Sequence, residues 1–179
     1  MDIAGGTLVS ERAGETLEER FDRLLKGNHA PLTRLAASYA MNRSDRDDLL
    51  QEIAMALWRA LPAFRGECSE RTFLYRIAHN RCITHISRRR DSVSLDDAQI
   101  EPEDPSASSE AIVAGEQKRR RFLQAIRELP EIHREVLVLF LEGMDYGEIA
   151  AVVGISENNV GVRLNRARQK LKALLGEDS

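Results

Sequence analysis

Apolar residues recur every three or four positions along most of the chain, which is the spacing of one face of an α-helix, and almost no stretch alternates like a β-strand. In the N-terminal 90 residues this spacing predicts four helices that form a compact bundle. Their inward-facing side chains are, helix by helix, Leu17, Phe21, Leu24 and Leu25; Leu32, Leu35, Ala36 and Tyr39; Leu49, Leu50, Ile53, Leu57, Trp58 and Leu61; and Phe73, Leu74, Ile77, Ala78, Ile83 and Ile86.

Residues that start and stop helices support these four segments. Thr16 with Glu19 three residues later has the spacing of a capping box. Ser44 is expected to cap the third helix, which Pro62 ends because proline has no N–H to continue the hydrogen-bond ladder. Ser69 is expected to start the fourth helix.

The C-terminal part predicts four further helices. Their inward-facing side chains are Phe122, Leu123, Ile126 and Leu129; Val136, Leu137, Phe140 and Leu141; a short segment that ends near Val152; and Val160, Leu164, Ala167, Leu171 and Leu174. The expected boundaries are, in order, Pro130, Gly143, the capping box Asp145–Glu148, Gly154 and the cap Ser156. A short helix, a glycine turn and a long basic helix are typical of a helix-turn-helix.

The segment between these two parts differs from both in composition. Residues 91–116 contain eight acids and no Lys or Arg, with two prolines and five serines. Such a mixture buries too little apolar surface to offset the entropy of ordering, so a flexible acidic linker is expected, with its last residues in the helix that follows. The fold class predicted is all-α, with two small four-helix domains at 1–90 and 117–179.

Composition excludes several classes of protein. Hydrophobic residues make up 42% and charged residues 31%, as in a soluble globular protein. No apolar run approaches the roughly 18 residues of a membrane span, and residues 1–19 lack the apolar core of a signal peptide. Cys68 and Cys82 are therefore expected to be reduced thiols in a cytoplasm.

Charge is distributed in blocks, which changes the meaning of the overall net charge of −3. Residues 64–90 carry a net +5, residues 91–116 a net −8 and residues 117–176 a net +4. Two basic blocks separated by an acidic one indicate two surfaces that can meet phosphate.

The last predicted helix has an outward face suited to DNA. The side chains left outside its apolar stripe are Asn158, Asn159, Gly161, Val162, Arg163, Asn165 and Arg166. The first turns of such a helix meet base edges, where amides and guanidinium groups form paired hydrogen bonds. Residues expected to meet phosphates instead are Arg166, Arg168, Lys170 and Lys172. The alternative is a basic, solvated helix in a bundle.

The fourth helix of the N-terminal part carries a second basic face. The residues outside its apolar stripe are Tyr75, Arg76, His79, Asn80, Arg81, His85, Arg88, Arg89 and Arg90. Aromatic, amide and arginine side chains together can hold phosphates and unpaired bases, although a solvated charged face is the alternative. The preceding helix is acidic, with Asp45, Asp47, Asp48, Gln51 and Glu52, so it faces solvent or a basic protein partner.

Three segments of the sequence resemble RNA polymerase sigma factors of the sigma-70 family, extracytoplasmic-function (ECF) subfamily. Residues 47–53 resemble the polymerase-binding helix. Residues 64–67, 72–80 and 88–90 resemble the segment that melts the promoter and recognises its −10 element. Motifs at 129–130, 134–136, 146–150 and 164–168 resemble the −35-binding domain.

The resemblance implies a function, partners and site residues. It implies a cytoplasmic, nucleoid-associated bacterial protein that directs core RNA polymerase to promoter DNA, contacts the clamp coiled coil and flap of the polymerase, and is controlled by an anti-sigma factor. Implied polymerase-binding residues are Asp47, Asp48, Leu50, Gln51 and Glu52. Implied −10 residues are Phe64, Arg65, Gly66, Tyr75, Arg76, Asn80, Arg81, Arg88 and Arg89, with a flipped base held by the loop around 64–69 and by Asn80. Implied −35 residues are Tyr146, Asn158, Asn159, Val162, Arg163, Arg166 and Arg168.

The sequence departs from the family pattern at two places. Phe73 stands where the family usually has Trp, and it is expected to pack in the same way. Asn159, Gly161 and Val162 replace a frequent Thr and basic or small polar residues, so the −35 preference is open while DNA binding is still expected.

Other functions find less support in the residues. His79, Cys82 and His85 suggest a metal site, but on one helix His85 is about 240° around the axis from His79, so no metal and no other cofactor is expected. No phosphate loop, nucleophile elbow or catalytic carboxylate pair is present, which argues against an enzyme. The alternatives are a helix-turn-helix regulator whose N-terminal bundle dimerises or senses a ligand, and a module that binds only proteins.

Overall fold

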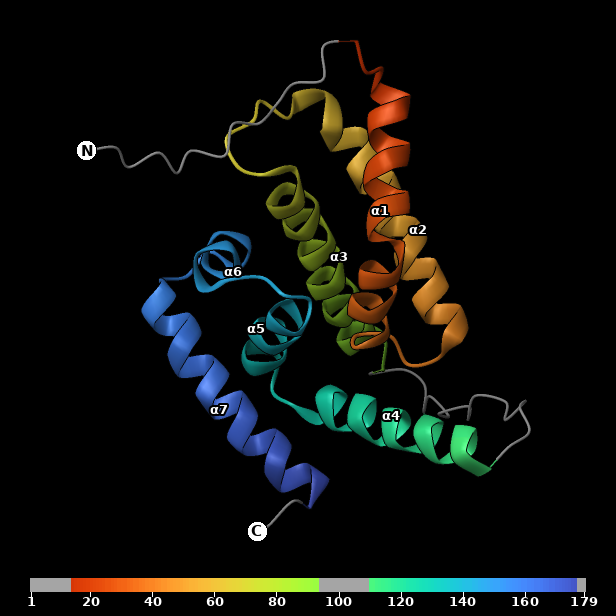
Figure 1. Ribbon diagram of the computed structural model, residues 1–179, viewed down its shortest axis with the longest axis vertical. Coiled ribbons are helices and arrows are strands. Elements are labelled where there is room, and N and C mark those ends of the chain that lie inside the picture. Colours follow the sequence, from red (N-terminus) through yellow and green to blue (C-terminus); the bar gives the residue numbers. More distant parts are fainter. Residues whose placement is uncertain (1–13, 94–109, 177–179) are drawn as a thin grey trace.

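The structure is a computed structural model that describes residues 14–93 and 110–176, and within these ranges every regular element is helical (Figure 1). The N-terminal half comprises α1 (Leu17–Ala37), α2 (Arg43–Ala60), the short 3₁₀ helix η1 (Leu61–Ala63) and α3 (Glu70–Val93). The C-terminal half comprises α4 (Glu110–Glu128), α5 (Glu131–Leu141), α6 (Tyr146–Val153) and α7 (Glu157–Leu175). The all-α fold class is confirmed.

The N-terminal half has three long helices instead of the four that the sequence predicted. The first two predicted segments form the single helix α1, with Pro31 inside it. Pro31 removes one backbone hydrogen bond, but Leu24, Leu32 and Leu35 remain on one buried face of α1. The tertiary packing of this face keeps the helix continuous through the proline.

Most of the predicted helix starts in this half are confirmed, and one is wrong. Thr16 and Glu19 form the expected capping box at the start of α1. Ser69 Oγ accepts a hydrogen bond from the backbone N–H of Thr72 at 3.0 Å, at the start of α3. Ser44 does not cap α2. Asn42 does so instead, because its side-chain oxygen accepts from the N–H of the residue three positions on, at 2.8 Å.

The C-terminal half contains the four predicted helices. Asp145 and Glu148 form a capping box, and Ser156 caps α7. Gly154 joins α6 to α7 with a φ of +78°, a left-handed conformation that glycine adopts without a steric cost. Helices α6 and α7 therefore form a helix-turn-helix. Helix α4 begins at Glu110, so the end of the predicted linker is helical, and residues 94–109 lie outside the described ranges.

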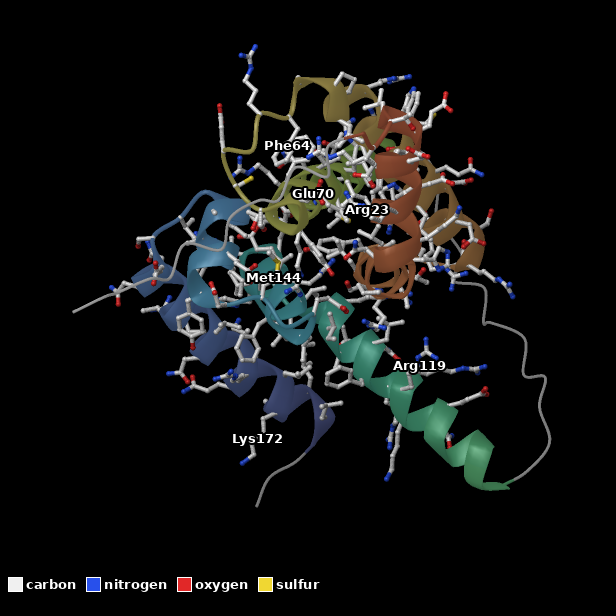
Figure 2. The ribbon with its side chains drawn as sticks, turned by 45° about the horizontal axis from the view of Figure 1, so that its top comes forward. Arg23, Phe64, Glu70, Arg119, Met144 and Lys172 are labelled. Atoms are coloured by element: carbon white, nitrogen blue, oxygen red, sulfur yellow. The ribbon has the colours of Figure 1, made fainter. Side chains whose placement is uncertain are left out.

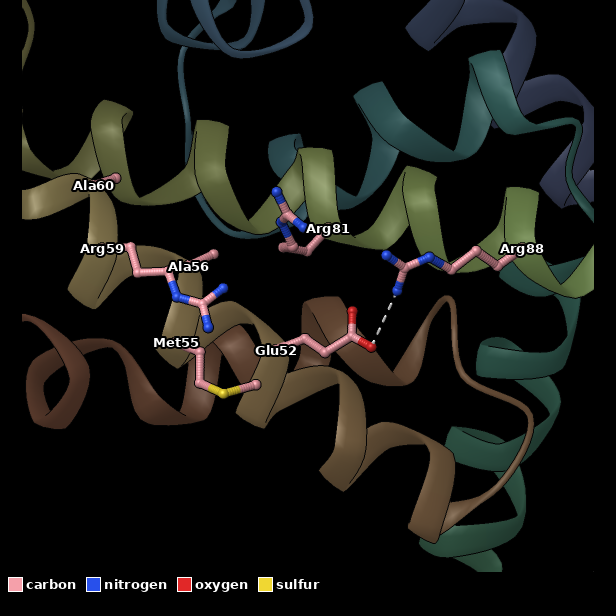
Figure 3. A pocket seen from close by; sticks show the side chains of 7 residues that line it. All are labelled: Glu52, Met55, Ala56, Arg59, Ala60, Arg81 and Arg88. Carbon is pink, nitrogen blue, oxygen red and sulfur yellow. Dashed lines mark ion pairs between the residues drawn. The ribbon is translucent and has the colours of Figure 1, made fainter.

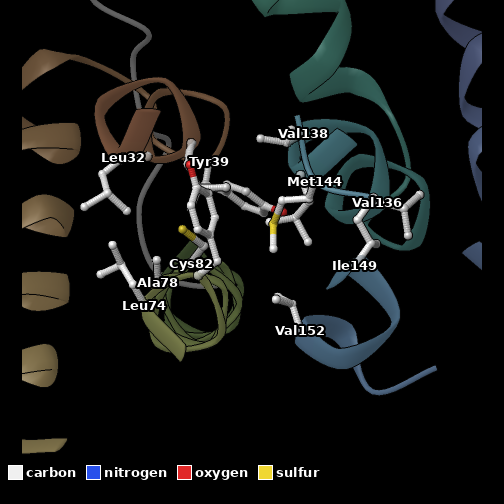
Figure 4. Packing of buried hydrophobic residues seen from close by; sticks show 14 of the residues in the cluster. Leu32, Tyr39, Leu74, Ala78, Cys82, Val136, Val138, Met144, Ile149 and Val152 are labelled. Atoms are coloured by element: carbon white, nitrogen blue, oxygen red, sulfur yellow. The ribbon is translucent and has the colours of Figure 1, made fainter. Parts of the chain in front are cut away.

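The two halves pack against each other through α3. This helix contacts α2 and α1 on one side and α6 on another, so it lies in the middle of the molecule (Figure 1). Tyr39 and Cys82 from the N-terminal half approach Met144 and Val138 from the C-terminal half in one apolar cluster (Figure 4). Met144 lies at the centre of the molecule between the halves (Figure 2).

Polar side chains also cross between the halves. Arg76 donates to the carbonyl of Ala151 at 3.0 and 3.2 Å, at the end of α6. Other pairs across the contact are Arg34 with Glu142 (2.6 Å), Arg90 with Glu131 (2.9 Å) and Arg127 with the carbonyl of Ala37 (3.0 Å). The contact between the halves is therefore mainly apolar and is crossed by several polar pairs.

Candidate polymerase and DNA interfaces

Helix α2 presents the acidic face that the sequence predicted. Its exposed polar residues include Asp47, Asp48 and Gln51. Glu52 is half-buried beside α3, with its carboxylate 3.5 Å from the guanidinium of Arg88. Leu50 is partly buried against the core, so it can offer only an edge to a partner. Three of the five predicted polymerase-binding residues thus project into solvent as one acidic surface.

Asp45 belongs to the interior of the N-terminal half and not to this acidic face. Its carboxylate lies 2.9 Å from His85 and 3.7 Å from Arg89, and it accepts from the N–H of Met41 at 2.7 Å. Arg89 also donates to the carbonyl of Tyr39 at 3.4 Å and contacts the sulfur of Met41. Arg89, predicted as a DNA contact, therefore ties the start of α2 to the end of α3.

Tyr75 and His79 do not lie on an open face of α3, contrary to the sequence prediction. Tyr75 is only 1% exposed and His79 is 6% exposed. Burial raises the pKa of the Tyr75 hydroxyl, with a smaller effect from Glu142 of the other half. The apolar stripe correctly identified the side of α3 that faces α1 and α2. It could not show that α5 and α6 cover a second side.

The remaining predicted −10 residues of α3 divide between two sides. Arg76 is exposed but bound to the carbonyl of Ala151. Arg81, half-buried, and Arg88, exposed, line a groove beside α2 (Figure 3). Asn80 is exposed and lies about 100° around α3 from Arg81, nearer to Arg76. A basic surface with an amide is thus open to solvent, although it is narrower than the sequence suggested.

The loop between α2 and α3 is held by aromatic packing at the top of the molecule, where Figure 2 labels Phe64. The rings of Phe64 and Phe73 lie 4.4 Å apart between centroids, and the guanidinium of Arg20 lies 5.0 Å from the Phe64 ring. Phe73 therefore packs as expected in place of tryptophan. Arg65 and Gly66 are exposed, and Gly66 has a φ of +76°.

An ion-pair cluster fixes the start of α3 to α1. Glu70 accepts from Arg20 at 2.7 Å and from Arg23 at 2.9 Å, and Arg23 also binds Glu15 at 2.7 Å. The hydrogen bond from Arg23 holds the pKa of the Glu70 carboxyl below its usual value of 4.5, against a smaller opposing effect of burial. This cluster orients the loop that precedes α3.

Helix α7 presents its first turns to solvent as a recognition helix should. Val160, Leu164 and Ala167 are buried, and the predicted DNA-facing residues Asn158, Asn159, Val162, Arg166 and Arg168 are exposed. Tyr146 at the start of α6 is also exposed, and its ring packs at 6.3 Å from Phe140. The guanidinium of Arg168 lies 4.7 Å from the Phe140 ring, which keeps this charge at the helix surface.

Arg163 is the exception on α7, because an acidic residue of α5 binds it. Its guanidinium lies 2.6 Å from one carboxylate oxygen of Glu135, and Nε2 of His79 lies 3.2 Å from the other. The Glu135 side chain is only 10% exposed. One buried carboxylate thus joins α3 of the N-terminal half to α7 of the C-terminal half.

Glu135 is a buried link between the halves that the sequence prediction missed. It stands at the start of a run of five buried residues, 135–139, and the four residues that follow it are all apolar. A charged residue inside such a run needs a partner, since burial of an unpaired charge is costly. That signal was present in the sequence, but it could not identify His79 and Arg163 as the partners.

The histidines and cysteines have separate surroundings. His79 points to Glu135 and His85 to Asp45, so the two rings face different helices. Burial raises the pKa of the Cys82 thiol far above its usual value, and Cys68 is a free thiol in the loop. Residues 14–93 and 110–176 contain no group of three or more His, Cys, Asp or Glu side chains that could hold a metal ion.

No helix in the described part of the chain is long and apolar enough to cross a membrane.

Comparison with protein families identifies the class of this molecule. The family model described as Sigma-70 region 2 matches residues 24–92, and that described as Sigma-70, region 4 matches residues 119–171. The RNA polymerase sigma factor CnrH of Cupriavidus metallidurans is 30% identical over 183 residues, covering 96% of this chain and 95% of CnrH. The ECF RNA polymerase sigma-E factor of Escherichia coli is 29% identical over 174 residues, covering 92% and 91%.

Solved structures agree with this fold. The structure of CnrH in complex with the cytosolic domain of CnrY has a TM-score of 0.66 at 30% identity, covering 90% of this chain and 91% of CnrH. The sigma factor RpoE of Bartonella quintana, solved with the anti-sigma factor NepR, has a TM-score of 0.71 at 22% identity, covering 90% and 99%, and supports the fold alone.

The chain belongs to the sigma-70 family of RNA polymerase sigma factors, in the extracytoplasmic-function subfamily. It is a transcription initiation factor that directs RNA polymerase to promoters. The alternative of a ligand-sensing regulator is not favoured, because sigma-70 models match both halves.

Proposed function

We propose that the two halves divide promoter recognition between them. Residues 1–90 bind core polymerase and the −10 element, and residues 117–179 bind the −35 element. Residues 91–116 join the two and let them engage DNA at separate positions. The protein acts on its partners without catalysis of its own, in the bacterial cytoplasm at the nucleoid, where core polymerase and promoter DNA are found.

The polymerase contact lies on α2. Asp47, Asp48 and Gln51 project together into solvent. Asp47 pairs with Arg46 at 2.8 Å, whereas Asp48 has no ion pair within residues 14–93 and 110–176. Such a surface fits the clamp coiled coil of the largest polymerase subunit if that element is basic where it meets α2. The C-terminal half meets the flap of the polymerase while its helix-turn-helix binds DNA.

The −10 contact uses the open side of α3 and the loop before it. Asn80 can both donate to and accept from a base edge, and the loop with Phe64, Arg65 and Gly66 supplies a wall for a base that leaves the stack. Arg81 and Arg88 are also reached by solvent, and their guanidinium groups fit phosphates. Tyr75 and Arg89 are structural residues in this proposal.

The −35 contact uses the first turns of α7. Asn158, Asn159 and Val162 are exposed and meet base edges in the major groove, while Arg166 and Arg168 lie further along and meet phosphates. Arg163 joins this set only after it leaves Glu135.

An anti-sigma factor is a further proposed partner. CnrH, at 30% identity, was solved with the cytosolic domain of CnrY, and this chain aligns with nearly all of that CnrH chain. A regulator of the same kind would keep this protein from polymerase until a signal releases it.

The observation that carries the proposed function is that one chain of this family has both an acidic surface on α2 and a basic helix-turn-helix. The test is affinity for core polymerase after Asp48→Lys with Glu52→Lys. Reversed charges facing a basic partner should abolish co-purification with core enzyme while helicity stays unchanged. The matched control is Glu18→Lys with Asp22→Lys, which has the same spacing on the exposed face of α1 and should bind normally. Normal binding by the α2 variant would contradict the proposed polymerase contact.

A further inference from the structure

The helix-turn-helix carries an apolar patch among the polar side chains of its exposed surface. Val162 of α7 is 42% exposed, and Tyr146 at the start of α6 is 39% exposed. Helices α6 and α7 pack against each other, so both side chains belong to the same end of the C-terminal half (Figure 1). Single exposed apolar residues are common on protein surfaces, so exposure alone assigns these two no role.

Gly161 lets the Tyr146 ring lie against the backbone of α7. A Cβ atom at position 161 would lie 3.4 Å from Cε2 of the Tyr146 ring. The side chain of alanine would therefore just touch the ring, and a longer side chain in the same direction would displace it. A glycine inside a helix lowers helix stability relative to alanine. At this position of α7 an aromatic ring from α6 thus takes the place of a side chain from α7 itself.

The Tyr146 ring is held in place by its neighbours. It packs edge to face against Phe140, with 6.3 Å between the ring centroids. The guanidinium of Arg168 lies 4.7 Å from the same Phe140 ring. The capping box of Asp145 and Glu148 fixes the first turn of α6, to which Tyr146 belongs. A ring that is already fixed loses little conformational entropy when it contacts a base.

Val162 lies in the middle of the exposed stripe of α7. Asn158 is four residues before it and Asn165 three residues after it, so the three side chains share one side of the helix. All three are exposed, whereas Val160 and Leu164 are buried. The two amides can hydrogen-bond to base edges, and Val162 meets a base edge between theirs.

The major groove offers a single apolar group to a side chain of this kind, the 5-methyl group of thymine. As a deepening of the proposed −35 contact, on which it rests, we propose that Val162 and the Tyr146 ring form an apolar surface that reads thymine methyl groups in the upstream element. At any other base, Val162 would cover a donor or acceptor without replacing its hydrogen bond to water. The amides of Asn158 and Asn165 match adenine, so the preferred element is rich in A·T pairs.

The test uses holoenzyme assembled from core polymerase and the full chain, with labelled promoter fragments selected from a pool with a randomised upstream element. Single thymines of the selected element are then replaced by uracil, which lacks only the methyl group. Wild-type holoenzyme should bind about 3- to 5-fold more weakly when uracil occupies one or two of these positions. Val162→Ser should bind the thymine and uracil fragments equally. The matched control is Leu174→Ser, 45% exposed near the end of α7, which should keep the wild-type difference.

A second variant tests the position of the ring. The side chain introduced by Gly161→Lys would displace Tyr146, so the difference between thymine and uracil should fall. Overall affinity should not fall in parallel, because the added cation can contact a phosphate. Gly161→Ala, whose Cβ would only touch the ring, should reduce the difference less.

Two results would overturn the inference. One is equal binding of thymine and uracil fragments by wild-type holoenzyme at every upstream position, or selection of an element with no enriched thymine. The other is a difference that Val162→Ser and Tyr146→Ala both retain, because other residues would then read the methyl group. Failure of the proposed function would look different, since fragments with a scrambled upstream element would then bind as well as the selected ones.

Discussion

Helices α3 and α7 are the two proposed DNA-binding helices, and they differ in how much of their surface is covered. α3 is packed against α2 on one side and α6 on another, so only part of its basic face is open. α7 packs against α4, α5 and α6, and its first turns stay exposed except at Arg163. The difference shows that a side chain outside the apolar stripe of a helix is not always an accessible one.

Glu135 connects the two helices that this comparison separates. Its carboxylate binds His79 of α3 and Arg163 of α7. Loss of either contact would leave the buried carboxylate with one partner fewer. In this arrangement the amides of Asn158 and Asn159 on α7 are exposed, while Arg163 is bound to Glu135. Moving the halves apart would release Arg76 from Ala151 and His79 from Glu135 and would expose Tyr75, while the Arg163–Glu135 pair lies within the C-terminal half.

The largest expected effect is on the free energy of unfolding, and it should distinguish the covered side of α3 from its open side. Tyr75→Ala should lower the free energy of unfolding by about 3–4 kcal/mol, because it empties a fully buried aromatic site between the halves. Asn80→Ala, five residues later on the open side, should change it by less than about 0.5 kcal/mol. Urea denaturation of both variants measures this. Equal stability of the two would mean that Tyr75 is a surface residue, as the sequence alone suggested.

A smaller effect is expected at the link between α3 and α7. Glu135→Gln keeps the shape of the side chain but removes the charge that Arg163 binds, so the free energy of unfolding should fall by about 2 kcal/mol. Glu128→Gln on the exposed face of α4 is the control and should be nearly neutral. If both variants are equally stable by urea denaturation, the buried link does not contribute to stability.

The cap of the recognition helix should contribute about 1 kcal/mol. Ser156→Ala removes the side-chain oxygen that accepts from the N–H of Asn159 at 3.3 Å. Thermal unfolding measures the loss. Ser87→Ala on the exposed side of α3 serves as the control, and a loss no greater than that of this control would show that the cap is not used.

The smallest effect concerns acid stability at the start of α3. The pKa of Glu70 is lower in the folded state than its usual value of 4.5, so its ion pairs stabilise the fold above that value and are lost as the pH falls through the folded pKa. Glu70→Gln should cost less than about 1 kcal/mol at neutral pH and flatten the fall in stability below about pH 5. Glu67→Gln in the loop should leave the pH profile unchanged, and an unchanged profile for Glu70→Gln would exclude this cause.

The sequence predicted local structure better than contacts between distant segments. Capping residues such as Thr16, Asp145 and Ser156 act on N–H groups three residues away, so their roles could be read from spacing alone. The predicted break in α1 was wrong because tertiary packing overrides a single proline. Leu24, Leu32 and Leu35 do keep one helical face across Pro31, so their spacing carried part of that information.

The candidate sites were predicted in part for the same reason. The exposed amides Asn158 and Asn159 follow from the apolar stripe of α7, which involves one helix only. The burial of Tyr75 and the pairing of Arg163 with Glu135 depend on where the other half docks. Periodicity within one helix cannot give that position.

The central claim is that this chain directs core polymerase to open promoter DNA, with Asn80 at the base-binding site. The most direct measurement is permanganate reactivity of −10 thymines in promoter fragments selected from genomic DNA by in vitro transcription with core polymerase and this chain. Wild-type protein should produce reactive thymines, and Asn80→Ala should retain binding to the closed promoter while reactivity falls. If core polymerase with wild-type protein selects no promoter and melts no DNA, the account is wrong.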